Sequence, residues 1–249
     1  MQTIDLNCDM WTICTKEWRQ FFSSLTGYIA LIVFLLLCGL LMFVFPDTSL
    51  LDFGYASLNN FFDLAPGVLL FLIPTITMRS LADEYKTGTF ELLKTMPLKP
   101  SQIVYGKFFG ALLIVLLALT PTVIYAISLQ ALSAIGGLDI GSTIGSYVGL
   151  LLLGAVFTSV GICTSSFTNN TVVTFVSAAF VCFLLYTGFE AVSKLPVFAL
   201  GAGYYIEMLG IKFHYNSISK GVIDIRDVLY FIGVIFIFLL ITQRNVARR

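Results

Sequence analysis

The hydrophobic positions of this chain lie in long, almost uncharged runs, and the polar positions are gathered between those runs. A helix needs about 20 mostly apolar residues to cross the hydrocarbon layer of a bilayer, where no water can satisfy a loose backbone. Six runs approach that length, so six membrane-spanning helices are predicted. Their approximate bounds are residues 28–45, 62–78, 101–130, 143–165, 171–189 and 227–243.

Two of these bounds need an argument of their own. Residues 140–189 carry no charge, a stretch too long for one span, and the polar turn at residues 164–170 divides it into two spans. In the third run, Pro121 predicts a kink because proline removes a backbone hydrogen bond. The sixth run is short, but Arg226 and Arg244 can extend toward the membrane surfaces at its two ends.

The fold class predicted by this pattern is an all-α integral membrane protein with a single domain, residues 1–249. Hydrophobic residues make up 58% of the chain, more than the roughly 45–50% of a soluble domain. Mean hydropathy is +0.94 and the net charge is zero, so no overall field would attract nucleic acid. Three of the five cysteines lie in apolar runs, where we expect them to be small buried side chains.

Lysine and arginine are distributed unevenly between the two sides that six spans define. Because cytoplasmic segments retain these residues, their distribution predicts orientation. Ten fall on the side of the two termini, and four fall on the other side, all in the last loop. Both termini are therefore predicted to be cytoplasmic. The first group is Lys16, Arg19, Arg79, Lys86, Lys94, Lys99, Lys107, Arg244, Arg248 and Arg249, and the second is Lys194, Lys212, Lys220 and Arg226.

An amphipathic helix is predicted at residues 10–26, before the first span. Its apolar side chains fall within an arc of about 100° at helical spacing, and Lys16 and Arg19 face away from that arc. Tryptophans on one side and basic residues on the other are typical of a helix lying in the membrane interface. A surface helix that faces a partner is the alternative. The apolar residues are Trp11, Cys14, Trp18, Phe21, Phe22 and Leu25.

Glycines recur once per helical turn near the start of the fourth span. Such a stripe lets two helices approach closely, either within the bundle or at a seam between two copies of the chain. The glycines are Gly137, Gly141, Gly145 and Gly149.

The sequence excludes several kinds of chemistry. Ion-driven pumps usually place ionisable groups inside the membrane, and we expect none in the interior of the spans. No intramembrane hydrolase motif is present, and His214, the single histidine, is expected to be a surface residue. A phosphate-binding loop of the Gly-x-x-x-x-Gly-Lys-Ser/Thr type is also missing, since Gly106 and Lys107 are followed by Phe108. Energy for vectorial work would have to come from another polypeptide.

The segment 79–100 is the part of the sequence best suited to receive that energy. It holds seven of the 28 charged residues and joins the second and third spans. Ser80 and Asp83 form a capping-box pattern. Thr87 and Gly88 should interrupt the helix, and "FELLKTM" should restart it with Phe90 and Leu93 on one side, Glu91 and Lys94 paired on another, and Pro97 as the stop. Apolar anchors with a charged rim suit a cytosolic partner, although a solvated connecting loop is the simpler alternative.

The same segment carries a family resemblance. "RSLADEYKTGTFELLKTMPLKPSQIVYGKF" contains an acidic patch, a Gly-Thr-x-Glu-Leu-Leu core, a proline and a Gly-Lys pair in that order, and it resembles the stretch after the second span in permease subunits of type-2 ABC exporters. "KEWRQFFSSLTGYIAL" is similar to the amphipathic helix that precedes their first span. "FHYNSISKGVIDIRDVLYF" resembles the segment leading into their last span. Together with "LDFGYASLNNFFDLAPGVLLFLIPTITMRS", the likeness is strongest to the gliding-motility-associated (Gld) branch.

This resemblance implies a permease in the cytoplasmic (inner) membrane of a bacterium, paired with a second copy or a sister permease. Two separate cytosolic ATPase subunits would bind ATP and Mg²⁺, and the chain itself would be no enzyme. The segment 79–100 would be the coupling helix, part of residues 195–211 would dip back into the outer leaflet, and Gly221, Asp224 and Arg226 would have a structural role such as capping. By motif, the residues expected to touch the ATPase are Asp83, Glu84, Gly88, Thr89, Glu91 and Leu92.

Two other functions are compatible with parts of this pattern. A membrane scaffold for envelope or motility proteins could use the charged segment as a docking site. An intramembrane enzyme is less compatible, because no catalytic constellation is visible. The motifs do not specify the transported substrate, because a fold of this kind serves many substrates.

Overall fold

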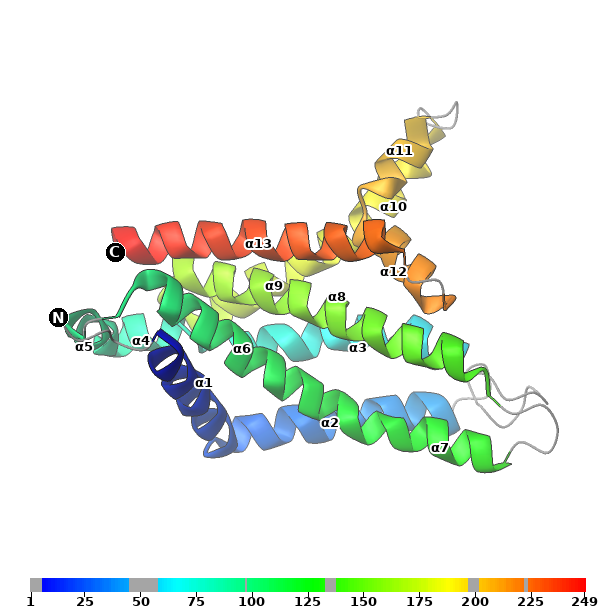
Figure 1. The fold of residues 1–249 in the computed structure, drawn as a ribbon, viewed down its shortest axis with the longest axis horizontal. Coiled ribbons are helices and arrows are strands. Elements are labelled where there is room, and N and C mark those ends of the chain that lie inside the picture. The colour runs from blue at the N-terminus through cyan, green and yellow to red at the C-terminus, as the bar shows by residue number, and fades with distance from the viewer. Residues whose placement is uncertain (1–5, 45–57, 97, 133–137, 197–201, 222–223) are drawn as a thin grey trace.

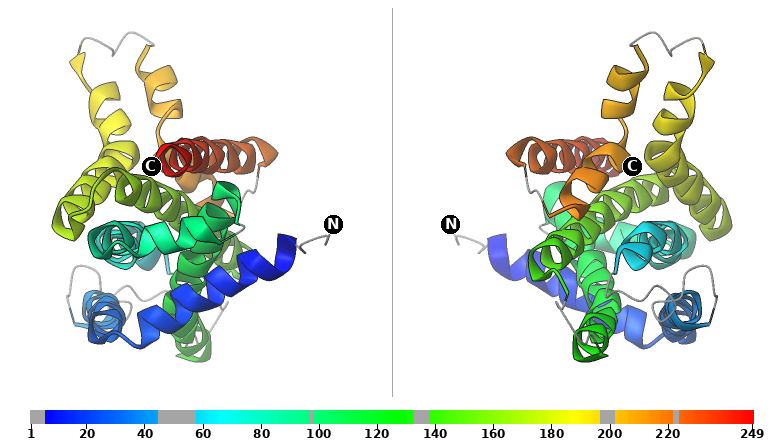
Figure 2. Two further views of the ribbon diagram at one scale, coloured as in Figure 1. Left: turned by 90° about the vertical axis from the view of Figure 1, so that its left-hand side faces the viewer. Right: turned by 90° about the vertical axis from the view of Figure 1, so that its right-hand side faces the viewer.

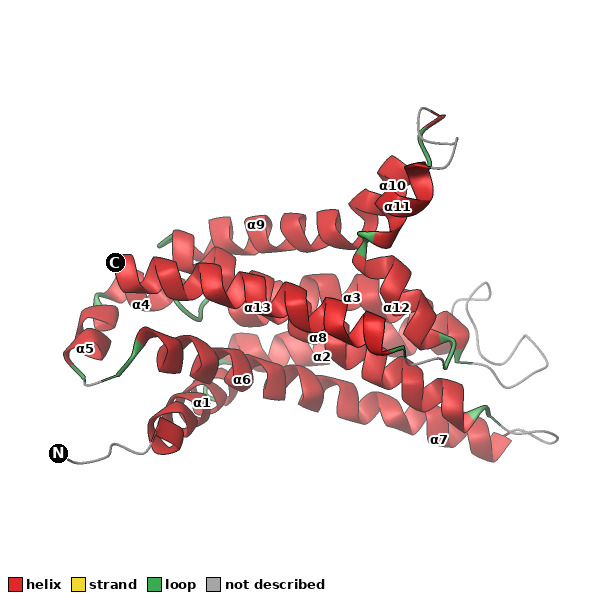
Figure 3. Ribbon diagram, turned by 45° about the horizontal axis from the view of Figure 1, so that its top comes forward, coloured by secondary structure: helices red, strands yellow, loops and turns green. Residues whose placement is uncertain are grey.

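The computed structural model describes residues 6–44, 58–96, 98–132, 138–196, 202–221 and 224–249. These residues form helices joined by short turns, with no strand among them, as Figure 3 shows. The prediction of an all-α fold is confirmed.

Six helical stretches are long and apolar enough to cross a membrane, in agreement with the sequence prediction. They lie side by side along the long axis of the molecule (Figure 1). The first three stretches are α2 (Leu25–Phe43), α3 (Asn59–Thr77) with the helical residues up to Thr87, and α6 (Pro100–Leu119) with α7 (Val123–Leu132). The other three are α8 (Ile140–Phe167), α9 (Thr171–Phe183) with the helical residues up to Ser193, and α13 (Ile225–Arg248).

The shorter helices lie at the two ends of this bundle. At one end, α1 (Leu6–Phe22) slants across the spans and lies near α4 (Ala82–Thr87) and α5 (Thr89–Thr95), and α13 ends there too (Figure 1). At the other end are α10 (Phe189–Ser193), α11 (Ala202–Met208) and α12 (Ile211–Ser219). Figure 2 shows α10 and α11 standing away from the bundle.

Two local breaks set the course of the long helices. A 3₁₀ turn, η1 (Thr120–Thr122), separates α6 from α7 at Pro121, which confirms the predicted irregularity there. A π-helical turn, η2 (Leu184–Gly188), separates α9 from α10, and the chain leaves the direction of the bundle beyond it (Figure 1). Insertions of this kind are a recognised cause of helix kinks.

The core is centred on α8, which packs against α3, α6, α9, α12 and α13. Leu150, Leu153 and Phe157 on α8 are fully buried. Gly161 brings α8 so close to α3 that an added Cβ atom would collide with the hydroxyl of Thr77. Among the cysteines, Cys14, Cys38, Cys163 and Cys182 are buried and free, as expected, because a thiol behaves as a small hydrophobe.

The glycine stripe of α8 packs within the chain. A Cβ atom on Gly145 would lie 3.1 Å from the carbonyl oxygen of Ile218, and one on Gly149 would lie 3.3 Å from the Ile218 side chain. Both glycines therefore allow α12 to lie close against α8. Gly141 lies in the first turn, where its N–H donates to Asp139, and Gly137 lies outside the described residues.

The segment before α13 has the structural role that was predicted for it. Asp224 accepts a hydrogen bond from the backbone N–H of Arg226 at 3.0 Å and so caps the helix. Gly221 has a φ of 85°, a left-handed conformation that glycine adopts without strain. Of the segment 195–211, residues 197–201 lie outside the described part, and its predicted return into the outer leaflet stays a prediction.

The prediction that His214 is a surface residue is wrong. Its side chain is buried between α12 and α13, with Nδ1 2.7 Å from Asp227 Oδ1 and Nε2 2.8 Å from the carbonyl oxygen of Met208. Tyr230 stacks on the imidazole at 4.0 Å between ring centroids. Sequence spacing did not reveal this pair, because residues 214 and 227 meet only when the turn at residue 221 brings α12 back beside α13.

Candidate functional site

The helices α4 and α5 form a small bent unit between the second and third spans. Gly88 separates them with a φ of 72°, which confirms the predicted interruption, because a left-handed residue cannot continue a helix. Phe90 folds back onto Tyr85, with ring centroids 4.7 Å apart, and is buried. The interruption therefore folds α5 back against α4 and leaves the other face of α5 exposed.

The residues expected to touch an ATPase separate into two groups in this unit. Gly88, Thr89, Glu91 and Leu92 are exposed, and Leu92 keeps 64% of its surface. Asp83 is half-buried. Glu84 is only 5% exposed, and its carboxylate is used inside the chain. The structure therefore moves Glu84 from the outer surface, where the motif placed it, to the interior.

An apolar groove of about 440 Å³ runs between α5 and α1. Leu92 of α5 and Met96 just after it line the groove, both largely exposed, and Ile13 and Lys16 line it from α1. Exposed apolar side chains with a charged residue at the edge resemble the core and rim of a protein interface. The predicted stop at Pro97 lies outside the described residues, and α5 itself ends at Thr95.

A buried cluster of charges joins this unit to the membrane helices. Lys107 of α6 is only 1% exposed, and its Nζ lies 2.6 Å from Glu17 Oε1 on α1 and 3.0 Å from Glu84 Oε1 on α4. It also donates to the carbonyl oxygen of Ser80 at 2.7 Å. Lys16 on α1 adds a second cation 2.8 Å from Glu84 Oε1. We call Lys16, Glu17, Glu84 and Lys107 the charge cluster.

The charge cluster contains two cations and two anions, so its net charge is zero. An unpaired ammonium in such a site would be very costly, because the low-dielectric interior cannot replace its hydration. Lys107 lies near the start of the third span, on the side of the bundle that the charge distribution predicts to be cytoplasmic. Lys16, which was predicted to face away from the apolar arc of α1, reaches Glu84.

Two glycines let α1 approach the lysine. An added Cβ on Gly106 would lie 2.8 Å from the Cβ of Ile13, and one on Gly110 would lie 2.9 Å from the Cβ of Glu17. Lys107 stands between them in sequence, on a helix that α1 crosses closely. Small residues four apart permit this kind of crossing. The single lysine between glycines at the start of an apolar run was the available sequence signal for the charge cluster.

The start of α4 is held by a distant side chain rather than by the predicted capping box. Ser165 Oγ on α8 accepts hydrogen bonds from the backbone N–H groups of Leu81 and Ala82, both at 3.0 Å. Neither Ser80 nor Asp83 makes a side-chain cap there. The predicted pairing of Glu91 with Lys94 is likewise not among the described ion pairs, and Lys94 lies over the Phe90 ring at 5.6 Å. A cap from α8 ties α4 to the core of the bundle.

The end of α13 also reaches α4. The guanidinium of Arg249 lies over the Tyr85 ring at 4.4 Å and donates to Asn169 and to the carbonyl oxygen of Phe167. Through these contacts and the charge cluster, α4 touches α1, α6, α8 and α13, four helices far apart in sequence. A displacement of α4 would therefore alter its contacts with all four of these helices.

The predicted amphipathic helix exists as α1, but its apolar arc is divided. Cys14 is buried, Trp18, Phe21 and Phe22 pack against the core as partly buried side chains, and Trp11 is 64% exposed. Trp18 and Phe22 contact each other with ring centroids 4.9 Å apart. The helix is thus firmly seated on α6, and its contact with a lipid surface stays a prediction.

Comparison with known proteins agrees with this architecture. The family model described as "ABC-2 family transporter protein" matches residues 11–241, which is nearly the whole chain. No curated protein matches. The match includes most of α1 and α13, the other five spans and the α4–α5 unit, so it covers the charge cluster and the docking surface but not Arg249. This chain therefore belongs to the ABC-2 family of transporter proteins, as a multi-pass membrane subunit.

Proposed function

We propose that this permease subunit is driven by a separate cytosolic ATPase, which docks on α4 and α5 and binds ATP and Mg²⁺. The observation that carries this proposal is the combination of an exposed apolar anchor, Leu92, with the buried charge cluster directly behind it. A partner can grip the exposed face of α5, while Glu84 and Lys107 join the same unit to α1 and α6. The unit is thus both accessible and rigidly connected.

The arrangement of the chain supports the orientation that the proposal needs. The helices α1, α4 and α5 and the C-terminal end of α13 lie at one end of the bundle (Figure 1). That end also holds ten of the 14 basic residues, so by the positive-inside rule it is the cytoplasmic end, in the inner membrane of a bacterium. A second copy or a sister permease would complete the path for substrate. Descent from the gliding-motility-associated branch is part of this proposal, with export as its direction.

The proposed mechanism is a rigid-body movement. Closure of the ATPase subunits pushes α5, and α4 moves with it because Phe90 and Tyr85 hold the two helices together. The charge cluster passes the displacement to α1 and α6, and Ser165 passes it to α8. Domains that rock about a packed interface move in this way, and the bundle would open outward.

The test is purification of the chain from its native membrane in mild detergent, with identification of the polypeptides that are recovered with it. Leu92→Asp should abolish recovery of an ATP-hydrolysing polypeptide that carries a phosphate-binding loop, because a charge replaces the apolar anchor. Leu209→Asp is the matched control, since Leu209 is similarly exposed, at 59%, at the opposite end of the bundle. Glu91→Lys should weaken recovery less, because its charge lies at the rim.

An unchanged complex in Leu92→Asp would contradict the docking assignment. Recovery of an adhesin or filament protein without any ATPase would favour a scaffold instead. Reversal of Glu84 is unsuitable for this test, because it would break the charge cluster and could unfold the chain.

A further inference from the structure

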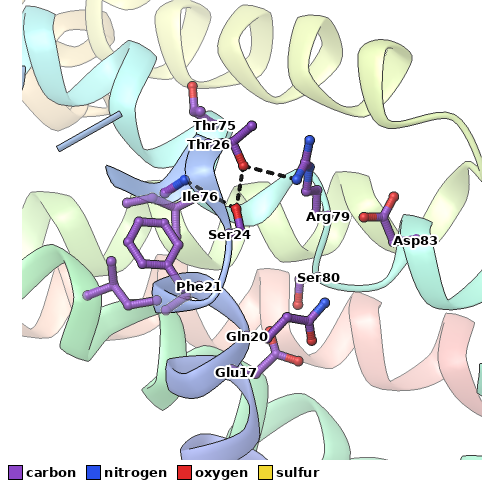
Figure 4. A pocket seen from close by; sticks show the side chains of 13 residues that line it. Glu17, Gln20, Phe21, Ser24, Thr26, Thr75, Ile76, Arg79, Ser80 and Asp83 are labelled. Atoms are coloured by element: carbon purple, nitrogen blue, oxygen red, sulfur yellow. Dashed lines mark hydrogen bonds between the residues drawn. The ribbon is translucent and has the colours of Figure 1, made fainter. Parts of the chain in front are cut away.

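A small cavity of about 100 Å³ lies where α1 turns into α2, beside the end of α3 and the middle of α6. Figure 4 shows its lining: Arg79 and Thr26 meet on one side, and Gln20 and Glu17 lie on another. The N-terminus of α2 is at this cavity, where a helix dipole favours negative charge. Of the residues expected to touch an ATPase, only Asp83 lines this cavity.

Arg79 brings a cation to the cavity without a partner anion. Its Nη1 donates to Thr26 Oγ1 at 3.0 Å, and Thr26 in turn shares a hydrogen bond with Ser24. No carboxylate in the described part of the chain lies within ion-pairing distance of the guanidinium. A guanidinium with free N–H groups beside two hydroxyls is a suitable site for a phosphate group.

A carboxylate lines the same cavity and is also free. Glu17 is committed to Lys107, but Asp83 makes no ion pair among the described residues. Asp83 lies near Arg79 in Figure 4 without bonding to it. The cavity therefore presents one unpaired cation and one unpaired anion, which together match a zwitterionic ligand.

Ser80 provides a second, independent observation at this cavity. The residue is 8% exposed and lines the cavity, and its Oγ has no hydrogen-bond partner. Its backbone carbonyl is occupied by Lys107, so the orphan hydroxyl is the group still to be satisfied. Buried polar atoms almost always have a partner, and leaving one without costs free energy.

The remaining walls are apolar. Phe21, Ile76 and Ala111 line the cavity, and the next residues of α2, among them Leu25 and Tyr28, are exposed apolar side chains at the start of a membrane span. A ligand here would have its polar end in the cavity and an apolar part against these surfaces. That combination describes a membrane lipid rather than a free metabolite.

We propose that this cavity binds the headgroup of an aminophospholipid, with its phosphate on Arg79, Thr26 and Ser24 and its primary ammonium on Asp83 and Ser80. Bound there, the lipid would neutralise Arg79 and Asp83 together. It would also fix the junction of α1 and α2 against the end of α3. The site would make the resting position of α1 sensitive to lipid composition.

Native mass spectrometry of the delipidated full chain in detergent tests the proposal. One molecule of phosphatidylethanolamine should be retained per chain. Phosphatidylcholine should bind about tenfold more weakly, because its methylated ammonium cannot donate a hydrogen bond to Asp83. Phosphatidylglycerol should also bind more weakly, because it brings no cation to the carboxylate. Free phosphoethanolamine should not compete at equal concentration, because it lacks the apolar part.

Two variants and one control locate the binding. Arg79→Gln should weaken phosphatidylethanolamine binding about tenfold, and Asp83→Asn should remove the preference over phosphatidylcholine. Lys86→Gln, which removes an exposed charge from α4 outside the cavity, should change neither. Equal binding of the three lipids by the unmodified chain would overturn the proposal, whatever the folding of the variants. Competition by free phosphoethanolamine, or full binding by Arg79→Gln, would overturn it as well.

Discussion

The two ends of the bundle both bury charge, but they use it differently. At the α4 end, Lys107 joins segments 90 and 23 residues away in sequence, on α1 and α4. At the α12 end, His214 meets Asp227, and Glu190 meets Lys194 and Lys212, and the two members of each pair are at most 22 residues apart. The first arrangement is a joint between separate parts of the chain. The second is a set of local clasps within one loop and the helices beside it.

This difference bears on where motion can be transmitted. A joint that connects α1, α4 and α6 moves them together, whereas a clasp between neighbouring elements only holds its own loop in shape. The exposed anchor Leu92 lies at the jointed end. The contrast leads to three predictions, in order of expected effect.

Lys107→Met should destabilise the protein most. The substitution leaves Glu17 and Glu84 buried together without their shared cation, and loss of one partner of a buried pair costs about 3–5 kcal/mol. Thermal unfolding in detergent, followed by size-exclusion chromatography, should show a large drop in the unfolding temperature. The triple variant Lys107→Met, Glu17→Gln, Glu84→Gln should recover part of it, because the one charge left without its partner, Lys16, is half-exposed to solvent.

Lys16→Met is the matched control for that experiment. Lys16 has the same charge and touches the same Glu84, but its side chain is 49% exposed, so the loss should be much smaller. If both single variants lose the same stability, Lys107 is not the centre of a buried joint.

Asp227→Asn should have a smaller and more local effect. It weakens the partner of a buried histidine, and an imperfectly satisfied buried group costs about 1–3 kcal/mol. Hydrogen exchange should rise in α11 and α12, with α4 and α5 unchanged. Faster exchange at α4 would show that the two ends are coupled and would contradict the division into joint and clasps.

Glu190→Gln should have the smallest effect. Its partners Lys194 and Lys212 are 70% and 34% exposed, and exposed ion pairs contribute about 0–1 kcal/mol. Hydrogen exchange of α10 should increase slightly in this variant. High salt screens the ion pairs and should therefore produce a similar increase in the unmodified chain. A loss as large as that of Asp227→Asn would contradict this ranking.

Much of the fold could be predicted because the hydrocarbon layer of a bilayer permits few backbone structures. The apolar runs predicted all six spans, and Pro121 and Gly88 predicted breaks that the structure contains. Each of these depends on a single stretch of sequence and on a backbone rule that neighbours cannot easily override.

The contacts that make the site could not be predicted in the same way. The sequence predicts Glu84 to be a surface residue of the segment 79–100, and it uses Lys107 only to predict orientation. The roles of both residues depend on where α1 crosses α6. Ser165 caps a helix 83 residues earlier in the chain, and His214 meets Asp227 through a turn. Pairings between distant segments leave no periodic signal, and only the glycines at 106 and 110 indicated a close crossing.

The π-helical turn η2 has a geometric consequence for the outer loop. Each residue of a helix turns the following side chain by about 100°, so one inserted residue redirects everything beyond it. Glu190, which follows the insertion, accepts a hydrogen bond from Lys212 at 2.7 Å. The direction in which α10 leaves the bundle thus depends on one inserted residue.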